Sequence, residues 1–139
     1  MRLGILSKGS RIYSTKRIRE AARNRGHRVI TYNPLKCQLN LMRYQHSIYY
    51  SGRKVNPPDV IVPRIGASLT NYGISVVRQF EILGANVLNS ADSISRSRDK
   101  MRSLQLLAAE GIHIPKTVMA RNPNQLVRAL QLTDGPPLS

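Results

Sequence analysis

The chain has 139 residues, of which 41% are hydrophobic, a share compatible with a folded globular protein of modest size. It contains no run of about 18 apolar residues, so the sequence predicts no membrane span. Its 22 Lys and Arg residues face 7 Asp and Glu, a formal net charge of +15, which attracts polyanions such as nucleic acid, nucleotide phosphates or acidic peptides. The one cysteine, Cys37, cannot form an internal disulfide and lies in no metal or catalytic motif, so an unreactive thiol in a reducing cytoplasm is expected.

The N-terminal segment predicts a strand, a helix and a second, parallel strand. RLGIL (2–6) is a short apolar run followed by a loop, and HRVITYN (27–33) has the composition of a second strand. Between them STKRIREAARNRG predicts a helix with Ser14 as its N-cap and Gly26 just past its end. The inner face of this helix is expected to carry Ile18, Ala21 and Ala22.

The middle of the chain predicts a hairpin and a second strand–helix–strand unit. No clean period is present over 34–44, whereas SIYYSGRKV (47–55) predicts a small hairpin. VIVPRIG (60–66) predicts a buried strand with Pro63 at its end, because proline cannot donate to a sheet. A helix over 71–83 and a strand over 85–89 follow. The helix is expected to bury one stripe of side chains, Ile74, Val77, Phe80 and Leu83.

Together these elements predict an α/β fold, a Rossmann-like parallel sheet with helices on its faces. Neither G-x-G-x-x-G nor G-x-x-x-x-G-K-[ST] is present, so the sequence supports no dinucleotide site of the usual Rossmann kind and no P-loop. The rest of the chain predicts a short helix over 90–98, a helix over 99–110 ended by Gly111, a strand over 113–120 and a last helix over 122–132 capped by Asn122.

Four cations lie around the N-terminus of the helix predicted over 99–110: Arg96, Arg98, Lys100 and Arg102. The N-terminus of a helix already carries partial positive charge, so this arrangement costs stability unless an anion binds there. Asp99 is the expected cap of this helix. Arg96, Arg98 and Arg102 are interpreted as a solvated basic face.

The segment RDKMRSLQLLAAEGIHIPKT resembles the R-D-K-x-x-x-x-x-x-L-x-x-x-G-I-x-x-P segment of ATP-grasp ligases. Further blocks resemble, in order, the RimK-type ribosomal protein glutamate ligases of that superfamily: ILSKGSRIYSTKRIREAARNRGH, IYYSGRKV, PRIGASLTNYGISVVRQFEILG and NSADSISRSRDKMRSLQLLA. The resemblance covers essentially the whole chain.

This resemblance implies a pre-ATP-grasp domain over 1–93, followed over 94–139 by the first helix, strand and helix of a truncated ATP-grasp domain. Enzymes of this family bind ATP with magnesium or manganese, activate a carboxylate as an acyl phosphate, and join glutamate to the C-terminus of a small-subunit ribosomal protein. The resemblance implies that Lys100 contacts the ATP phosphates. It also implies that the N-terminal domain contributes to the peptide site and to contacts between copies of the chain.

Two strand ends supply the candidate substrate-binding residues: Arg64 and Gly66 after one strand, and Ser7 and Lys8 after another. Parallel sheets present ligands at the carboxyl ends of their strands, and an arginine there can hold a carboxylate by two hydrogen bonds. For Arg64, a structural arginine that pairs across the domain interface is the open alternative. An ordinary exposed lysine is the alternative for Lys100.

The family's second phosphate-binding lysine, its glycine-rich lid and its metal ligands have no counterpart in this sequence, so the chain alone is expected not to catalyse ligation. The seven acidic residues form no cluster, and His27, His46 and His113 have no ligand spacing, so neither a metal site nor a catalytic triad is predicted.

Two other functions remain open at this stage. One is a free-standing binding module derived from this domain, which recognises ribosomal protein tails or modulates a full-length partner by forming oligomers. The other is a small RNA- or ribosome-binding protein, supported by the basic surface and by tyrosines that could stack on bases: Tyr13, Tyr32, Tyr44, Tyr49 and Tyr50. No RNA-binding motif accompanies them, and tyrosine beside β-branched residues is typical of strand packing.

Overall fold

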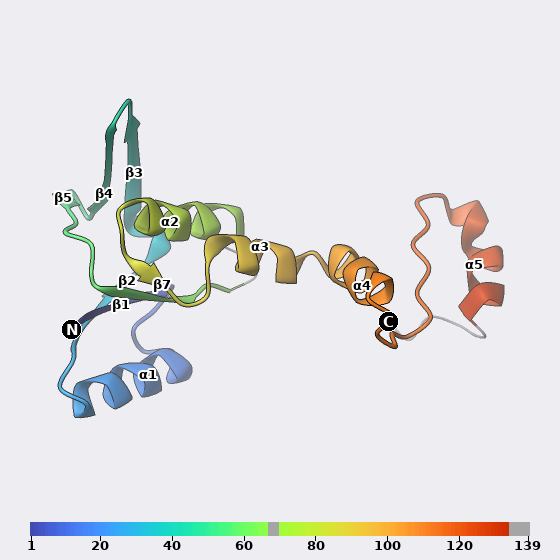
Figure 1. The fold of residues 1–139 in the computed structure, drawn as a ribbon, viewed down its shortest axis with the longest axis horizontal. Coiled ribbons are helices and arrows are strands. Elements are labelled where there is room, and N and C mark those ends of the chain that lie inside the picture. The colour runs from blue at the N-terminus through green and yellow to red at the C-terminus, as the bar shows by residue number, and fades with distance from the viewer. Residues whose placement is uncertain (67–69, 134–139) are drawn as a thin grey trace. The chain divides into compact units, whose positions relative to one another are not determined.

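The computed structural model describes residues 1–66 and 70–133, and the chain divides into two compact units, Met1–Ser97 and Arg98–Ser139. Figure 1 labels the elements along the chain. Those of the first unit are β1 (Arg2–Ser7), α1 (Tyr13–Asn24), β2 (Arg28–Tyr32), the 3-10 turn η1 (Pro34–Lys36), β3 (Cys37–Met42), β4 (Gln45–Tyr50), β5 (Arg53–Lys54), β6 (Val60–Arg64), α2 (Thr70–Ile82), β7 (Asn86–Val87) and α3 (Ala91–Arg98), whose last residue lies past the boundary.

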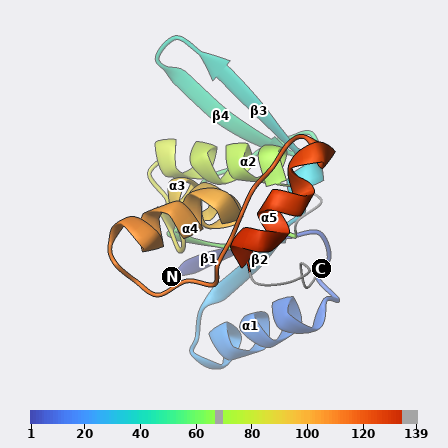
Figure 2. The ribbon, with the colours of Figure 1, turned by 90° about the vertical axis from the view of Figure 1, so that its right-hand side faces the viewer.

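The first unit is built on a parallel sheet in the order β2-β1-β6-β7. In this sheet Leu3 is paired with Val29 on one side and with Val60 on the other. Helix α1 covers one face and α2 the other, as Figures 1 and 2 both show. The Rossmann-like parallel sheet predicted from the sequence is therefore confirmed.

The hydrophobic core lies mainly between this sheet and α2. Val77 and Phe80 are fully buried, and Ile74 and Leu83 are half-buried against the same cluster, so the stripe predicted for α2 is confirmed. Strand residues from both sheets complete the cluster, which consists of Leu6, Tyr32, Cys37, Ile48, Ile61, Val76, Val77, Phe80, Ala85 and Ala91.

Helix α1 differs from its prediction in its cap and in its buried face. The N-cap residue is Ile12, which makes no side-chain cap, and Ser14 lies inside the helix, so the prediction of Ser14 as N-cap is wrong. Thr15 and Ala22 are buried, whereas Ala21 is exposed. The hydroxyl of Thr15 is hydrogen-bonded to that of Ser7, and this polar contact brings Thr15 to the sheet and turns Ala21 away from it.

The edge strand β7 is shorter than the predicted strand over 85–89, and this explains where Pro63 lies. Pro63 is inside β6 rather than at its end. The N–H of Leu88 donates to the carbonyl of Ile61 at 3.0 Å, so the backbone polar groups of Ile61 point towards β7. Pro63 lies two residues further on, so its backbone nitrogen points to the same side. Because β7 ends at Val87, the missing N–H of Pro63 falls where the ladder stops and costs no hydrogen bond within it.

The predicted hairpin is part of a three-stranded antiparallel sheet, β3-β4-β5. Tyr50 pairs with Arg53 across a turn at Ser51 and Gly52, both of which have positive φ, and this confirms the hairpin over 47–55. Strand β3, in the region without a clean period, was not predicted. Its residues Cys37, Leu39 and Leu41 alternate with polar Gln38 and Asn40, a strand signal that the prediction overlooked. Its outer residues Leu41 and Met42 are 64% and 58% exposed.

Gly4 occupies a position in β1 that has no room for a side chain. A Cβ there would lie 2.5 Å from Cδ1 of Ile61 and 2.9 Å from Cγ of Pro58, and Ile61 is fully buried. We therefore expect Gly4→Ala to lower the free energy of unfolding by about 1–2 kcal/mol, measured by urea denaturation. Gly66→Ala is the matched control, since its Cβ would meet nothing within 4 Å. Equal midpoints for the two variants would contradict this account.

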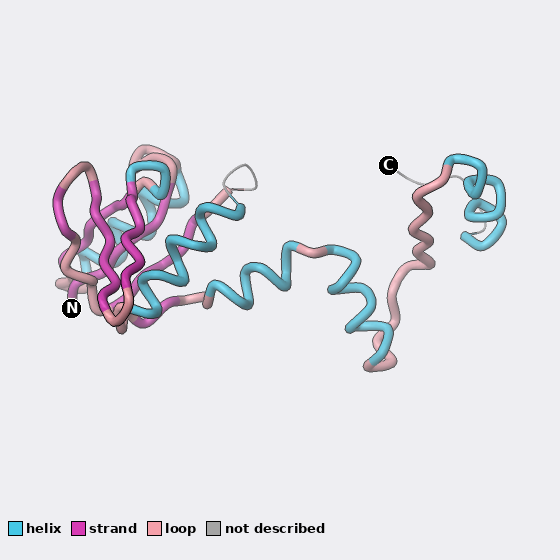
Figure 3. The backbone as a smooth tube through the Cα atoms, turned by 90° about the horizontal axis from the view of Figure 1, so that it is seen from above, coloured by secondary structure: helices cyan, strands magenta, loops and turns pink. Residues whose placement is uncertain are grey.

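The second unit contains α4 (Lys100–Ala109), the 3-10 turn η3 (Pro123–Gln125) and α5 (Leu126–Thr133). Gly111 has a φ of 71° just past α4, and the side chain of Asn122 accepts the N–H of Asn124, so both predicted end signals are confirmed. The strand predicted over 113–120 is wrong: Figure 3 shows only loop between the two helices. A strand needs a partner for its backbone groups, and no other strand lies among the described residues of this unit.

Two compositional predictions can be compared with the structure. Among the described residues, no helix is long and apolar enough to cross a membrane. Cys37 is buried, and burial raises the pKa of its thiol to about 11, so it is protonated at neutral pH. This agrees with the expected unreactive thiol.

Candidate functional site

The carboxyl ends of β1, β2 and β6 meet at one edge of the parallel sheet, which is where such sheets present ligands. Two cavities lie at this edge, one on each side of the loop that leaves β1. Ser7 and Lys8, from the end of β1 and the loop that follows, contribute to the walls of both. This edge is therefore the candidate functional site of the first unit.

The first cavity, which we call the arginine pocket, has a volume of about 340 Å³. It brings together four residues that the sequence predicted as substrate-binding, since Arg64 and Gly66 at the end of β6 face Ser7 and Lys8. The remaining lining residues are Ile12, Ser14, Thr15, Pro63 and Ile65. Arg64 is exposed, and its Nη2 donates to the hydroxyl of Ser14 at 3.1 Å, which leaves other guanidinium N–H groups for a ligand.

Ser7 has a different place in the pocket from the other three residues. It is only 1% exposed, and its hydroxyl is hydrogen-bonded to the hydroxyl of Thr15 at 2.8 Å and to the carbonyl of Gly9 at 3.1 Å. The N–H of Gly9 also points to this hydroxyl, at 3.4 Å. The side chain of Ser7 therefore holds the β1–α1 loop in shape, and Lys8 is the residue of this loop that extends outward.

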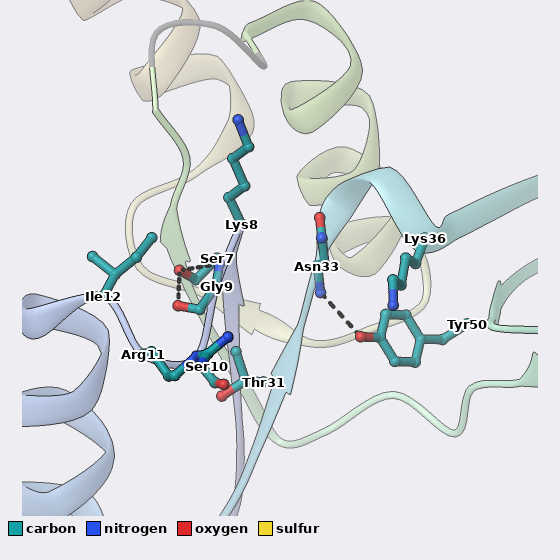
Figure 4. A pocket seen from close by; sticks show the side chains of 10 residues that line it. All are labelled: Ser7, Lys8, Gly9, Ser10, Arg11, Ile12, Thr31, Asn33, Lys36 and Tyr50. Carbon is teal, nitrogen blue, oxygen red and sulfur yellow. Dashed lines mark hydrogen bonds between the residues drawn. The ribbon is translucent and has the colours of Figure 1, made fainter.

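The second cavity, which we call the tyrosine pocket, has a volume of about 300 Å³ and is shown in Figure 4. One wall is the loop from Ser7 to Ile12, and the other carries Thr31, Asn33, Lys36 and Tyr50. The residues of this second wall were not among the predicted site residues. Asn33 directly follows β2, so the strand-end rule that selected Ser7 and Arg64 would have selected it too.

Neither pocket is lined by a carboxylate among the residues that the structure describes. The acids of the first unit are engaged elsewhere: Glu20 pairs with Lys16 and Arg17, Asp59 with Arg2, and Asp92 with Arg96, while Glu81 accepts the N–H of Ala91. Lys8, Arg11, Lys36 and Arg64 thus contribute positive charge to the pockets with no described acid to balance it. Such an edge favours anionic ligands.

In the second unit, Lys100 is the first residue of α4 and is exposed. The side chain of Asp99 accepts the N–H of Arg102 at 2.9 Å, so the predicted cap is confirmed. The sequence predicted all four cations near the start of one helix, but they are divided between two helices. Arg96 and Arg98 belong to the last turn of α3, where positive charge is favourable, and only Lys100 and Arg102 begin α4.

The cap at Asp99 fixes the start of α4 and hence the place of Lys100. We expect Asp99→Ala to destabilise the helix by about 1 kcal/mol, because it leaves the N–H of Arg102 without its partner. Faster hydrogen exchange of the α4 amides measures this effect. Asp99→Asn is the matched control, since asparagine caps equally well. Unchanged exchange in the alanine variant would contradict the role of the cap.

No metal site can be assigned to the described part of the chain. Among residues 1–66 and 70–133 no three His, Cys, Asp or Glu side chains come together in a group that could hold an ion. The described residues of the two pockets offer cationic and N–H groups for anions, but no ligand set for a divalent metal.

Solved structures define the class of fold. The RimK domain ATP-grasp protein from Sphaerobacter thermophilus matches with a TM-score of 0.71 at 21% identity, over 94% of this chain and 46% of that one. The macrocyclase MdnC from Microcystis aeruginosa, bound with its precursor peptide MdnA, matches with a TM-score of 0.67 at 17% identity, over 94% of this chain and 50% of that one. The chain therefore shares the fold of about half of each of these two proteins.

Sequence relatives give the family. Residues 1–94 match the RimK PreATP-grasp domain, and the chain belongs to this family. It is 46% identical over 138 residues to a probable alpha-L-glutamate ligase of Halorhodospira halophila, and 49% identical over 137 residues to one of Stenotrophomonas maltophilia. These alignments cover 99% of this chain but 46% and 47% of the relatives, so the chain spans about half their length.

Proposed function

We propose that the chain works in an ATP-dependent ligase that joins glutamate to the C-terminal carboxylate of a small-subunit ribosomal protein. In this reaction a carboxylate oxygen attacks the γ-phosphorus of ATP and ADP leaves. The amine of glutamate then attacks the acyl carbon, phosphate leaves, and a peptide bond forms. The relatives named probable glutamate ligases support glutamate as the amine that is joined, and MdnC, solved with its precursor peptide, supports a peptide acceptor.

The observation that carries this proposal is the arginine pocket. Arg64 presents a guanidinium fork that matches a carboxylate, and Lys8 adds a second positive charge to the same cavity. Ser7 acts as a positioning residue, because its hydroxyl fixes the loop that carries Lys8. The open space beside Gly66 leaves the backbone there accessible to the end of a peptide.

Lys100 is proposed to contact the phosphates of ATP. It lies at the N-terminus of a helix, where unpaired N–H groups favour anions, and its side chain is exposed. Magnesium or manganese is proposed as the accompanying metal, and the ATP-grasp ligase PsnB has been solved with Mg and ADP. The described residues hold no ligand set for it, so the proposal includes no catalytic step by the 139-residue chain alone.

Two of the five tyrosines considered for base stacking pack against each other, whereas Tyr13 and Tyr44 are 77% and 86% exposed. Tyr32 is 5% exposed, and its ring meets that of Tyr50 edge to face with 5.3 Å between centroids. The ring of Tyr32 packs inside the protein, and that of Tyr50 is half-buried against it, as tyrosines beside strand residues commonly are. The cations of the arginine pocket, Arg64 and Lys8, favour a peptide carboxylate as the ligand.

The test compares two short peptides of identical sequence, one with a free C-terminal carboxylate and one with a C-terminal amide. The 139-residue chain is expected to bind the free acid about tenfold more tightly, because Arg64 and Lys8 recognise its charge. Fluorescence anisotropy titration measures both affinities. Equal affinities, or binding of neither peptide, would overturn the proposal.

A further inference from the structure

Two polar side chains that line the tyrosine pocket, those of Asn33 and Tyr50, accept hydrogen bonds from within the protein and keep donors for a ligand. The N–H of Leu35 donates to Oδ1 of Asn33 at 3.1 Å, and this fixes which way the amide points. The N–H of Asn33 in turn points to the phenol oxygen of Tyr50 at 3.4 Å. What remains for a ligand are the NH₂ group of Asn33 and the O–H proton of Tyr50.

The charges around this pocket agree with that pattern. Lys8, Arg11 and Lys36 come from the β1–α1 loop and from η1, and none of them has a described carboxylate within ion-pair distance. At the cavity wall the hydroxyl of Thr31 is buried and has no hydrogen-bond partner among the described residues. Donors and positive charge together fit an anion that accepts hydrogen bonds.

We propose that the tyrosine pocket binds an acidic side chain of the acceptor polypeptide, just upstream of its C-terminal carboxylate. This inference rests on the proposed function, which assigns that carboxylate to the arginine pocket. The two pockets share Ser7 and Lys8 in their walls, so a ligand that fills one has its next group beside the other. Lys36 and Tyr50 then select peptides with an acidic side chain, and Arg64 selects peptides whose C-terminal carboxylate is free.

The surroundings of the pocket favour a polypeptide over a small free anion. Tyr50 is the last residue of β4, and Lys36 directly precedes β3, so the pocket lies at the base of the three-stranded sheet (Figure 4). Residues 21–58, which include this sheet, contain no Asp or Glu. Among the strands of residues 1–66 and 70–133, β3 pairs with β4 alone, and its other edge can meet an extended chain. An acidic peptide therefore finds a complementary surface beyond the pocket itself.

The experiment uses three peptides that differ only at their ends: Glu-Ala with a free carboxylate, Gln-Ala with a free carboxylate, and Glu-Ala with a terminal amide. The chain is expected to bind the Glu peptide about tenfold more tightly than the Gln peptide. Lys36→Gln and Tyr50→Phe should each reduce this preference to less than about threefold, while the preference for free acid over amide stays unchanged. Lys54→Gln is the matched control, since Lys54 is an exposed lysine outside both pockets.

The outcomes separate the two proposals. If the wild-type chain prefers the free acid over the amide but treats Glu and Gln alike, the tyrosine pocket is not an acidic side-chain site and only this inference fails. The same holds if Lys36→Gln and Tyr50→Phe keep the full preference for Glu. If free acid and amide bind equally, the proposed function fails. Binding of no peptide overturns both.

Discussion

Replacing Phe80 with alanine is expected to lower the free energy of unfolding of the first unit by about 3–5 kcal/mol. The ring is fully buried in the cluster between the sheet and α2, and its centroid lies 5.6 Å from that of Tyr32. Removing it deletes buried apolar surface and leaves a cavity that close-packed neighbours can fill only in part. Small domains have a total stability of about 5–15 kcal/mol, so this change takes a large share of it.

Chemical denaturation followed by circular dichroism measures the effect. Ile82→Ala is the matched control on the same helix, because Ile82 is 53% exposed and its truncation should change stability by less than about 1 kcal/mol. Similar midpoints for the two variants would contradict the assignment of the core. A loss of stability in both would indicate that α2 buries a different face.

Replacing Arg64 with glutamine is expected to weaken binding of a peptide with a free C-terminal carboxylate by about 10- to 100-fold. Arg64 is exposed at the end of β6, and only one hydrogen bond, to Ser14, is made by its guanidinium among the described residues. The variant should leave binding of the amidated peptide nearly unchanged, because that peptide lacks the charge. Arg64→Lys should lie between wild type and Arg64→Gln, since it keeps the charge without the two-pronged geometry.

Arg53→Gln is the control for net charge. Arg53 lies on β5 and lines neither pocket, so its loss lowers the charge of the chain by the same amount at a different place. If both variants weaken binding equally, the effect is a general one of the basic surface. That result would remove Arg64 from the site.

The parallel sheet was predictable because its signals are local and agree with one another. The apolar run of β1, the glycine with positive φ after α1 and the apolar stripe of α2 each point to the same strand–helix–strand units. The cap at Asp99 is also local, since it involves atoms three residues apart. The strand-end rule then brought Arg64, Gly66, Ser7 and Lys8 to one edge from the order of the elements alone.

The errors have a common cause in contacts between distant residues. Ser14 is displaced as a cap because the buried face of α1 is set by the hydroxyl of Ser7, eight residues before Thr15. Strand β3 was missed although apolar and polar residues alternate over 37–41, because that run is short and its strand character comes from pairing with β4. Residues 113–120 have strand composition, but composition supplies no partner strand. The tyrosine pocket depends on Tyr50, which is distant in sequence from Asn33 and joins it only in the fold.

The most direct test of the account is a two-dimensional NMR titration of the 139-residue chain with the free-acid peptide. The account predicts that the backbone amides of Lys8, Gly9, Arg64 and Gly66 shift most, that those of Arg53 and Lys54 stay in place, and that the amidated peptide causes much smaller shifts. Shifts confined to other parts of the chain, or equal shifts with both peptides, would contradict the claim that the carboxyl edge of the parallel sheet binds a peptide carboxylate.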